Sequence, residues 1–399
     1  MAEAMDRRAA IALTSLLTAL VALGPLSTSL YVPSMPVLVQ EFATTPALIQ
    51  RSFTVYVIGF AAAQLAYGPL SDRFGRRPVL IGGLLLYIAA SVGCALSTGI
   101  GGFLVARFVQ GLGACAGPVV GRAIVRDSFD RDGAVRAFAF IGTAIALAPA
   151  LGPLIGGFLE VWLGWQSAFG FLVVYGLGMI WLVAARLGET IPARDPAATD
   201  PTRLLRNYAM LLGNRRYLGF LVSGIFCFGG LFAYTAAIPF LFIGRLGLAP
   251  DSFGMLSVFT VSAYASGSIL AGRLHGRLSP RAAIRVGGLL ALTGGALMVA
   301  LSGELSLPRV IGPMMLFVFG FGLLLPSGTA GALHPFPRIA GSASAMMGFL
   351  QMAVGAAGSY ALSRLYDGSA LSLGLLILGL AAAGAAGFEL ITPKSMQEG

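Results

Sequence analysis

Long apolar runs, each of about 20 residues, follow one another along almost the whole chain of 399 residues and constrain its fold more than any other feature. About 20 apolar residues in a helix span the hydrocarbon core of a bilayer. Apolar residues make up 57% and charged residues 11% of the chain, against about 45–50% and about 25% in ordinary soluble domains. The pattern predicts an all-α integral membrane protein.

Twelve such runs can be counted, and each predicts one transmembrane helix. The first run is longer than the apolar part of a signal peptide, and no small-residue cleavage site ends it, so we expect it to be a retained span. The predicted spans cover residues 10–33, 47–69, 79–98, 101–123, 135–158, 163–185, 216–242, 252–272, 283–302, 308–330, 341–363 and 369–391.

The basic residues give an independent test of this count, because Lys and Arg gather in cytoplasmic loops. With a cytoplasmic N-terminus, 21 of the 26 basic residues fall in cytoplasmic segments, 4 fall on the opposite side, and Arg107 lies within a span. The distribution predicts a multi-pass protein with both termini in the cytoplasm. It also explains the net charge of +10 without a nucleic acid, since no soluble basic module is present.

One polar segment divides the chain into three predicted parts. These are a six-helix half at 1–186, a cytoplasmic linker at 187–215, and a second six-helix half at 216–399. Within the linker, Asp200 can cap a helix that begins at Pro201 and ends near Gly213. Leucines on one face of that helix and arginines on the other favour a position in the membrane interface.

The two halves show signs of an internal sequence repeat. Tyr31 and Pro36 in span 1 recur 203 positions later as Tyr234 and Pro239 in span 7. A second set, Gly68, Leu70 and Arg73, recurs at a spacing of 204 as Gly272, Leu274 and Arg277. Two pseudo-symmetric six-helix halves are the architecture of a large class of secondary transporters.

Motifs along the chain resemble those of the major facilitator superfamily. The stretch GPLSDRFGRRPVL, starting at Gly68, resembles its signature loop between spans 2 and 3, and RFVQGLGACAG and GTAIALAPALGPLIGG resemble its motifs in spans 4 and 5. RAIVRDSF and FPRIAGSASAMMGFLQ are similar to the bicyclomycin and chloramphenicol resistance subgroup of twelve-span drug:proton antiporters. The resemblance implies the major facilitator fold, alternating access and a bacterial inner membrane.

The loop after span 2 has a physical interpretation of its own. Gly75 permits a backbone conformation that is closed to other residues, and Asp72 stands among arginines with which it can pair. The resemblance implies a cytoplasmic gate in which Asp72 holds the halves together, whereas the alternative is a basic loop that only sets topology. The predicted gate residues are Gly68, Asp72, Arg73, Gly75, Arg76 and Arg77.

Span 5 carries small residues at a spacing of four: Ala144, Ala148, Gly152 and Gly156. Such a row lets another helix approach closely, and we expect a moving contact between the halves; static packing is the alternative. The residues that match the antiporter motif of the family are Gly142, Pro149, Gly152, Pro153, Gly156 and Gly157.

Arg107 is the one basic residue within a predicted span, and Gln110 lies on the same helix face. An intramembrane arginine usually faces a polar interior and has a function. The resemblance implies a role in proton coupling or in the central cavity. The alternative is a side chain that reaches outward to the interface.

A coupling acid is missing from the span interiors, because all sixteen acidic residues map to loops, termini or span ends. Members of the resembled family usually carry an aspartate in span 1, and here Ser29 occupies that position. Proton coupling would then fall to Arg107, Asp72 or Asp127, or to the loop histidines His275 and His334.

A cavity for varied ligands should be apolar and aromatic with a few polar anchors. We expect small amphiphilic or hydrophobic molecules and protons as partners of a monomer in the lipid bilayer, with no cofactor and no metal. The three cysteines lie in apolar runs and suggest packing only. The predicted lining residues are Ser29, Tyr31, Tyr56, Gln64, Arg107, Gln110, Phe228, Tyr234, Tyr264, Met346, Met347 and Gln351.

The sequence therefore predicts a drug or metabolite efflux transporter that works by proton antiport. A facilitator or symporter for a single metabolite is the second possibility. The absence of the span-1 acid makes it less remote, and the antiporter-like motif in span 5 argues against it. A membrane enzyme or a sensor without transport is more remote, since the chain shows no nucleophile elbow, phosphate loop or soluble domain.

Overall fold

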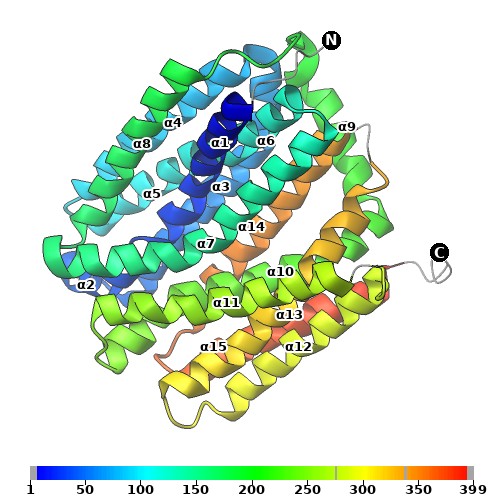
Figure 1. Ribbon diagram of the computed structural model, residues 1–399. Helices are drawn as coiled ribbons and strands as arrows, with labels where there is room; N and C mark the ends of the chain where they lie inside the picture. The colour runs from blue at the N-terminus through cyan, green and yellow to red at the C-terminus, as the bar shows by residue number, and fades with distance from the viewer. Residues whose placement is uncertain (1–6, 275, 337–338, 393–399) are drawn as a thin grey trace.

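A computed structural model describes residues 7–274, 276–336 and 339–392. Within these residues, twelve helices are long and apolar enough to cross a membrane. The predicted number of spans and the all-α class are thereby confirmed (Figure 1). Three predictions fall outside the described residues: those for the two chain ends, 1–6 and 393–399, and that for His275. We expect both chain ends to lie in the cytoplasm.

The helices form two bundles that we name by chain order (Figure 1). The N-terminal bundle consists of α1 Arg7–Ser29, the 3-10 turn η1 Val32–Ser34, α2 Met35–Glu41, α3 Pro46–Phe74, α4 Arg76–Ala95, α5 Ile100–Ala114, α6 Ala116–Ser128, α7 Arg131–Leu163 and α8 Gln166–Arg186. The C-terminal bundle consists of α10 Arg215–Pro239, the π turn η3 Phe240–Arg245, α11 Pro250–Leu274, α12 Pro280–Ala300, α13 Leu307–Leu333, α14 Ala340–Leu365 and α15 Ala370–Ile391.

The ends of most predicted spans shift by up to five residues, as in Pro46–Phe74 and Asp132–Leu163, and two spans differ further. The first span continues through η1 and α2 to Glu41 instead of ending at 33. Pro33 and Pro36 do not end it, because each stands in the first turn of a new helical segment, where a missing N–H costs nothing. The fourth span is divided at Cys115, where α5 gives way to α6.

The linker contains the short turn η2 Pro196–Thr199 and the helix α9 Pro201–Leu212. Asp200 caps α9 by accepting a hydrogen bond from the N–H of Thr202 at 2.9 Å, as the sequence predicts. Leu211 is fully buried, whereas Leu205 is exposed. The helix therefore packs one part of its apolar face on the protein and leaves another part free for lipid.

The bundles meet along two helix pairs, α3 with α14 and α7 with α11. We call the end of the molecule that carries α9 the linker end. The opposite end, which carries η1, α2 and η3, is the far end. Where the helices of these two pairs touch, the space between the bundles is closed.

Candidate functional site

At the far end, α7 and α11 touch through their backbones. A Cβ atom built on Gly157 would lie 2.3 Å from the carbonyl oxygen of Pro250, and one on Gly254 would lie 2.4 Å from that of Pro153. Any larger side chain at these positions would force the helices apart. The far end is therefore closed by backbone contact between the bundles.

The small-residue row of α7 does not make this contact, contrary to the sequence-based expectation. A Cβ atom on Gly152 would meet the Ser29 hydroxyl, and one on Gly156 would lie 1.8 Å from the carbonyl oxygen of Leu30. The row packs on α1 within the same bundle. Pro153 and Gly157 lie about 100° further round the helix, and that face reaches the other bundle.

The bundles also touch along α3 and α14. The hydroxyl oxygens of Thr54 and Ser359 are 2.8 Å apart and both side chains are buried. Further along the pair, Gln64 lies against Gly348, where a Cβ atom would come within 1.8 Å of the Gln64 Oε1 atom. The two bundles are therefore in direct contact along α3 and α14.

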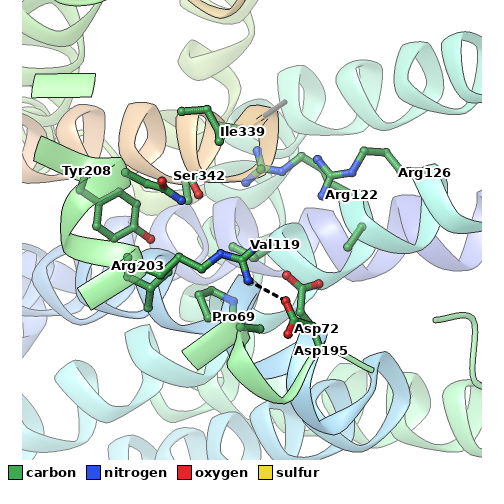
Figure 2. A pocket seen from close by; sticks show the side chains of 18 of the residues that line it. Pro69, Asp72, Val119, Arg122, Arg126, Asp195, Arg203, Tyr208, Ile339 and Ser342 are labelled. Carbon is green, nitrogen blue, oxygen red and sulfur yellow. Dashed lines mark hydrogen bonds and ion pairs between the residues drawn. The ribbon is translucent and has the colours of Figure 1, made fainter. Parts of the chain in front are cut away.

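At the linker end the bundles separate around a cavity of about 230 Å³ (Figure 2). Its lining comes from α3, α6, the linker with α9, and the start of α14, and includes Asp72, Arg122, Tyr208 and Ser342. None of the twelve predicted ligand-binding residues lines this cavity. The structure is thus closed at the far end and hollow at the linker end.

The predicted gate loop lies at the rim of this cavity, and Arg76 is its centre. The Arg76 guanidinium pairs with Asp72 and Asp127, with 2.8 Å from Nε to the Asp127 carboxylate. Its Nη1 atom also donates to the Ser71 hydroxyl at 2.8 Å. Arg76 therefore ties α3, α4 and α6 of one bundle together.

The linker holds the loop in place from outside. The backbone N–H of Asp195 donates to the carbonyl oxygen of Asp72 at 3.1 Å, and Arg73 donates to the hydroxyl of Thr199 at 2.5 Å. No hydrogen bond or ion pair joins Asp72 to the C-terminal bundle within the described residues. In this state Asp72 does not latch the two bundles together, contrary to the expectation from the family resemblance.

Glu189 completes the loop, and sequence reasoning missed it, because only its place as an acid at the start of the linker marks it. Its carboxylate accepts a hydrogen bond from the N–H of Arg76 at 2.9 Å. Gly75, with φ +103°, brings the chain so close that a Cβ atom would lie 2.4 Å from this carboxylate. Partial burial opposes ionisation, but the N–H donors of Arg76, Ile191 and Thr190 hold the pKa of Glu189 below its usual range.

Arg107 lies in the interior of the N-terminal bundle and is fully buried, so the alternative of a side chain reaching the interface is wrong. The guanidinium carbon lies 4.1 Å from the ring centre of Tyr31 and 4.5 Å from that of Tyr56. Its Nη1 atom donates to the carbonyl oxygen of Ser27 at 3.2 Å and to Gln110. Two aromatic faces and two neutral oxygens thus stabilise the charge.

A chain of hydrogen bonds continues from this arginine. The Gln110 amide donates to the Ser91 hydroxyl at 2.8 Å, and Ser91 donates to the carbonyl oxygen of Tyr87 at 2.8 Å. The Tyr87 hydroxyl lies 2.6 Å from that of Ser27. No carboxylate pairs with Arg107 among the residues described.

Ser29, at the position where the family resemblance leads us to expect an acid, faces another way. Its hydroxyl donates to the carbonyl oxygen of Pro25 at 2.7 Å and lies 3.4 Å from that of Ala148 on α7. The side chain is 4% exposed. Ser29 therefore belongs to the α1–α7 contact and makes no contact with Arg107 that the structure shows.

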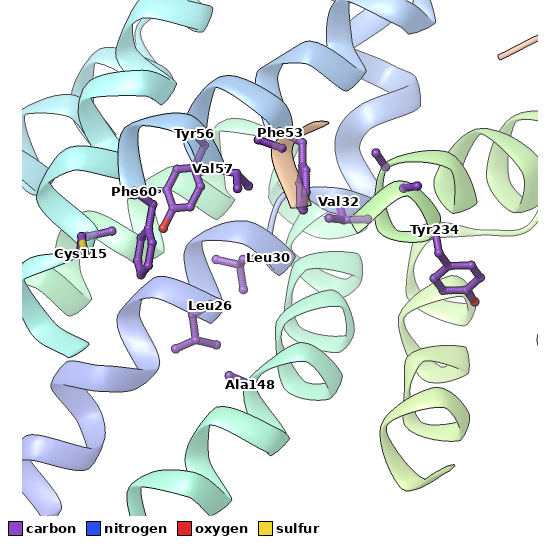
Figure 3. Packing of buried hydrophobic residues seen from close by; sticks show 14 of the residues in the cluster. Leu26, Leu30, Val32, Phe53, Tyr56, Val57, Phe60, Cys115, Ala148 and Tyr234 are labelled. Carbon is purple, nitrogen blue, oxygen red and sulfur yellow. The ribbon is translucent and has the colours of Figure 1, made fainter. Parts of the chain in front are cut away.

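Phe228 and Tyr264, two further predicted ligand residues, pack inside the C-terminal bundle. The ring of Phe228 packs on Phe321 at 5.1 Å, and Tyr264 packs on the same ring at 5.5 Å. Figure 3 shows Tyr56 directed toward α1 and Tyr234 turned away from the N-terminal bundle. Met346 and Gln351 are buried on α14, and Met347 is partly buried beside them.

Comparison with known proteins decides the family. Residues 17–359 match the sequence profile of the Major Facilitator Superfamily. The chain belongs to this superfamily. The resemblance drawn from the motifs is confirmed, and membership of a transporter family also confirms the expectation that the chain is a transporter rather than an enzyme.

Several relatives of this major facilitator protein carry names that state an activity. Multidrug resistance protein D of Escherichia coli (strain K12) is 31% identical, with 87% of each chain covered. A chloramphenicol resistance protein of Pseudomonas aeruginosa is 33% identical over 90% of this chain and 87% of its own length. An uncharacterised MFS-type transporter, YdgK of Bacillus subtilis (strain 168), is 31% identical over 96% of both chains.

Solved structures support the same fold. The crystal structure of a D-xylose-proton symporter matches with a TM-score of 0.76, covering 97% of this chain and 99% of that chain, at 16% sequence identity. At this identity the likeness concerns the fold alone. It agrees with the predicted architecture of two six-helix halves.

Proposed function

We propose that this major facilitator protein exports drugs or other small amphiphilic molecules by alternating access, in exchange for protons. The observation that carries the proposal is the asymmetry between the two ends. The bundles touch at the far end through Gly157 and Pro250 and separate at the linker end around a cavity. The drug-resistance names of the relatives support the substrate class.

The proposed orientation places the linker end in the cytoplasm of a bacterium and the protein, as a monomer, in its inner membrane. The halves at 1–186 and 216–399 rock about the linker at 187–215. Support comes from the positive-inside pattern, since Arg76, Arg122 and Arg203 all gather at the linker end. The state described by the structure is then open toward the cytoplasm.

The proposed ligand path runs along the seam between α3 and α14 when the bundles part. Gln64 would line it, because it meets Gly348 of α14, and Met346, Met347 and Gln351 of α14 would lie beside it. Phe228 and Tyr264 would join this surface from inside the C-terminal bundle. Tyr31, Tyr56 and Gln110 would act behind this surface, since they surround Arg107 inside one bundle.

Acids at the rim of the cavity are the candidates for proton coupling. Asp72 and Asp127 share Arg76 at the cytoplasmic rim, so protonation of either would loosen the gate loop. Glu160 on α7 is a further acid to consider, because its Oε2 atom is buried. Uncoupled facilitated transport, or symport of one metabolite, remains the second candidate, favoured by Ser29 in place of an acid.

Transport in proteoliposomes with an imposed pH gradient tests the proposal. Ethidium and chloramphenicol serve as probe substrates, and native protein is compared with Ser29→Asp and Arg107→Ala. We expect efflux by the native protein to rise with the gradient. Efflux that ignores the gradient until Ser29→Asp is introduced would support the facilitator instead, and no transport of any probe would contradict drug export.

A further inference from the structure

The cavity at the linker end has an excess of positive charge. Among the residues that the structure describes, four arginines line it, namely Arg76, Arg122, Arg126 and Arg203, against two aspartates, Asp72 and Asp195. Four positive and two negative side chains leave a formal net charge of +2. This surface therefore attracts anions into the space between the bundles.

Both aspartates already have arginine partners. Asp72 pairs with Arg76, and Asp195 pairs with Arg203 at 2.8 Å. The neighbouring acid Asp127 is also engaged by Arg76, at 2.8 Å. Arg122 and Arg126 are thus left without an ion pair or hydrogen bond in the described part of the chain.

Arg122 and Arg126, the two arginines without an ion pair among the described residues, lie on one face of α6. They stand four residues apart, one helical turn, where two like charges repel each other. Figure 2 shows both side chains extending from α6 toward Ile339 and Ser342 at the start of α14. An anion placed between α6 and α14 would relieve this repulsion.

The start of α14 adds a second, independent feature. The helix has 26 residues, and its N-cap residue, Ile339, provides no side-chain hydrogen bond. A helix N-terminus carries a partial positive charge of about +0.5 and N–H groups that favour anions. Gly341, Ser342 and Ser344 from the first turns line the same cavity. Donors from two bundles therefore converge on one space.

We propose that this cavity binds the anionic head of an amphiphile, a phosphate or carboxylate group, between Arg122 and Arg126 on α6 and the N-terminus of α14. The volume of about 230 Å³ suits a head group, since sites for whole drug-sized ligands occupy about 300–1,000 Å³. The group comes either from a free anion in the cytoplasm or from an anionic lipid of the inner leaflet, and both present the same chemistry.

Binding measurements on the purified full chain test this site without any transport. One arm measures the thermal unfolding midpoint in detergent with inorganic phosphate, against potassium chloride at equal ionic strength. The other arm counts, by native mass spectrometry, the phosphatidylglycerol retained from mixed phosphatidylcholine nanodiscs. Arg122→Gln with Arg126→Gln is the test variant. Arg136→Gln with Arg206→Gln is the control, because it removes the same charge from two exposed positions.

We expect the native chain to bind at least one probe and the test variant to bind it at least about tenfold more weakly, a loss of about 1.4 kcal/mol. The control should bind like the native chain. Phosphate binding identifies a free anion, and retained lipid that phosphate does not displace identifies a lipid head group. If the double variant does not fold, Arg126→Gln alone and the charge-preserving Arg122→Lys take its place.

The proposal is overturned if the native chain binds neither probe, or if test and control variants lose binding equally. Because no gradient and no drug are present, these results are independent of drug export. Transport without anion binding would leave the proposed function intact, and anion binding without transport would leave this site intact.

Discussion

The charge of Arg107 is stabilised by neighbours and not by a partner acid. Tyr31 and Tyr56 present ring faces, and Ser27 and Gln110 present neutral oxygens. An ion in a low-dielectric interior is costly unless it is satisfied in such ways. The neighbouring rings and the two oxygens stabilise the cation, while its Nε and Nη2 atoms have no hydrogen-bond partner among the described residues.

Replacing Arg107 should destabilise the N-terminal bundle. Arg107→Ala leaves a void between two tyrosine rings and strands the oxygens of Ser27 and Gln110, so we expect a loss of about 2–5 kcal/mol. Reversible unfolding in mixed micelles measures it. Arg136→Ala, an exposed arginine on α7, should change stability by less than about 0.5 kcal/mol. Equal effects of both variants would show that Arg107 has no special environment.

The lowered pKa of Glu189 predicts that the stability of the gate loop depends on pH. Its pKa is lower in the folded protein than the unfolded value, which is about 4.3. The stabilisation is therefore present above about pH 4.3 and is lost as the pH falls through the folded pKa. Glu189→Gln should lower the thermal midpoint at neutral pH, and the difference from the native protein should vanish in acid.

The control for this experiment is Glu41→Gln, an exposed acid at the far end. We expect it to leave the midpoint unchanged at every pH. A difference between Glu189→Gln and native protein that persists below the folded pKa would show that the substitution acts through packing and not through the charge.

At the scale of elements, α7 uses two faces for two contacts. Gly152 and Gly156 let α1 approach within one bundle, and Pro153 and Gly157 meet α11 of the other. Helical periodicity separates adjacent residues by about 100°, so neighbouring glycines serve different partners. Only the second contact has to break when the far end opens.

A bulky residue at Gly157 should therefore shift the conformational equilibrium. Gly157→Val would place its Cβ atom 2.3 Å from the Pro250 carbonyl oxygen, at a cost to the closed far end of about 1–3 kcal/mol. We expect faster maleimide labelling of Asp251→Cys, by about tenfold. The native cysteines are buried and give little background.

Gly142→Val is a matched control on the same helix, because a Cβ atom there would meet nothing within 4 Å. It carries the same change in helix propensity and should not alter labelling. If both valines speed labelling equally, the effect belongs to the helix and not to the contact between the bundles.

At the scale of the whole molecule, transport by rocking requires that the far-end seam opens. Thr54 on α3 and Ser359 on α14 have hydroxyl oxygens only 2.8 Å apart. Cysteines at both positions should form a disulfide that locks the far end closed. We expect oxidation to reduce efflux to below about a tenth, and reductant to restore it, because the cycle cannot complete from one state.

The single variants Thr54→Cys and Ser359→Cys are the controls and should transport equally with and without oxidant. Full transport by the oxidised pair, with the cross-link verified by mass spectrometry, would mean that the bundles do not separate along α3 and α14.

A structural feature could be predicted from the sequence where it depends on interactions between residues that are close together in the chain. Span count, orientation signals and the cap of α9 by Asp200 follow from hydropathy, charge and turn chemistry, which act over a few residues. The signature loop was likewise recognisable from its own residues. Its partner Glu189, 113 positions from Arg76, was not, because nothing local marks which distant acid will meet a given N–H.

The sequence by itself thus determined a twelve-span transporter of the major facilitator type, with Ser29 where the family resemblance implies an acid. Only the tertiary structure decided that Tyr31 and Arg107 turn into one bundle and that Gly157 and not Gly156 faces the other. It also decided that Arg122 and Arg126 make no ion pair or hydrogen bond within the described residues. The physical reason is that a helix fixes the spacing of its side chains, whereas the neighbour each face meets depends on how all the helices pack together.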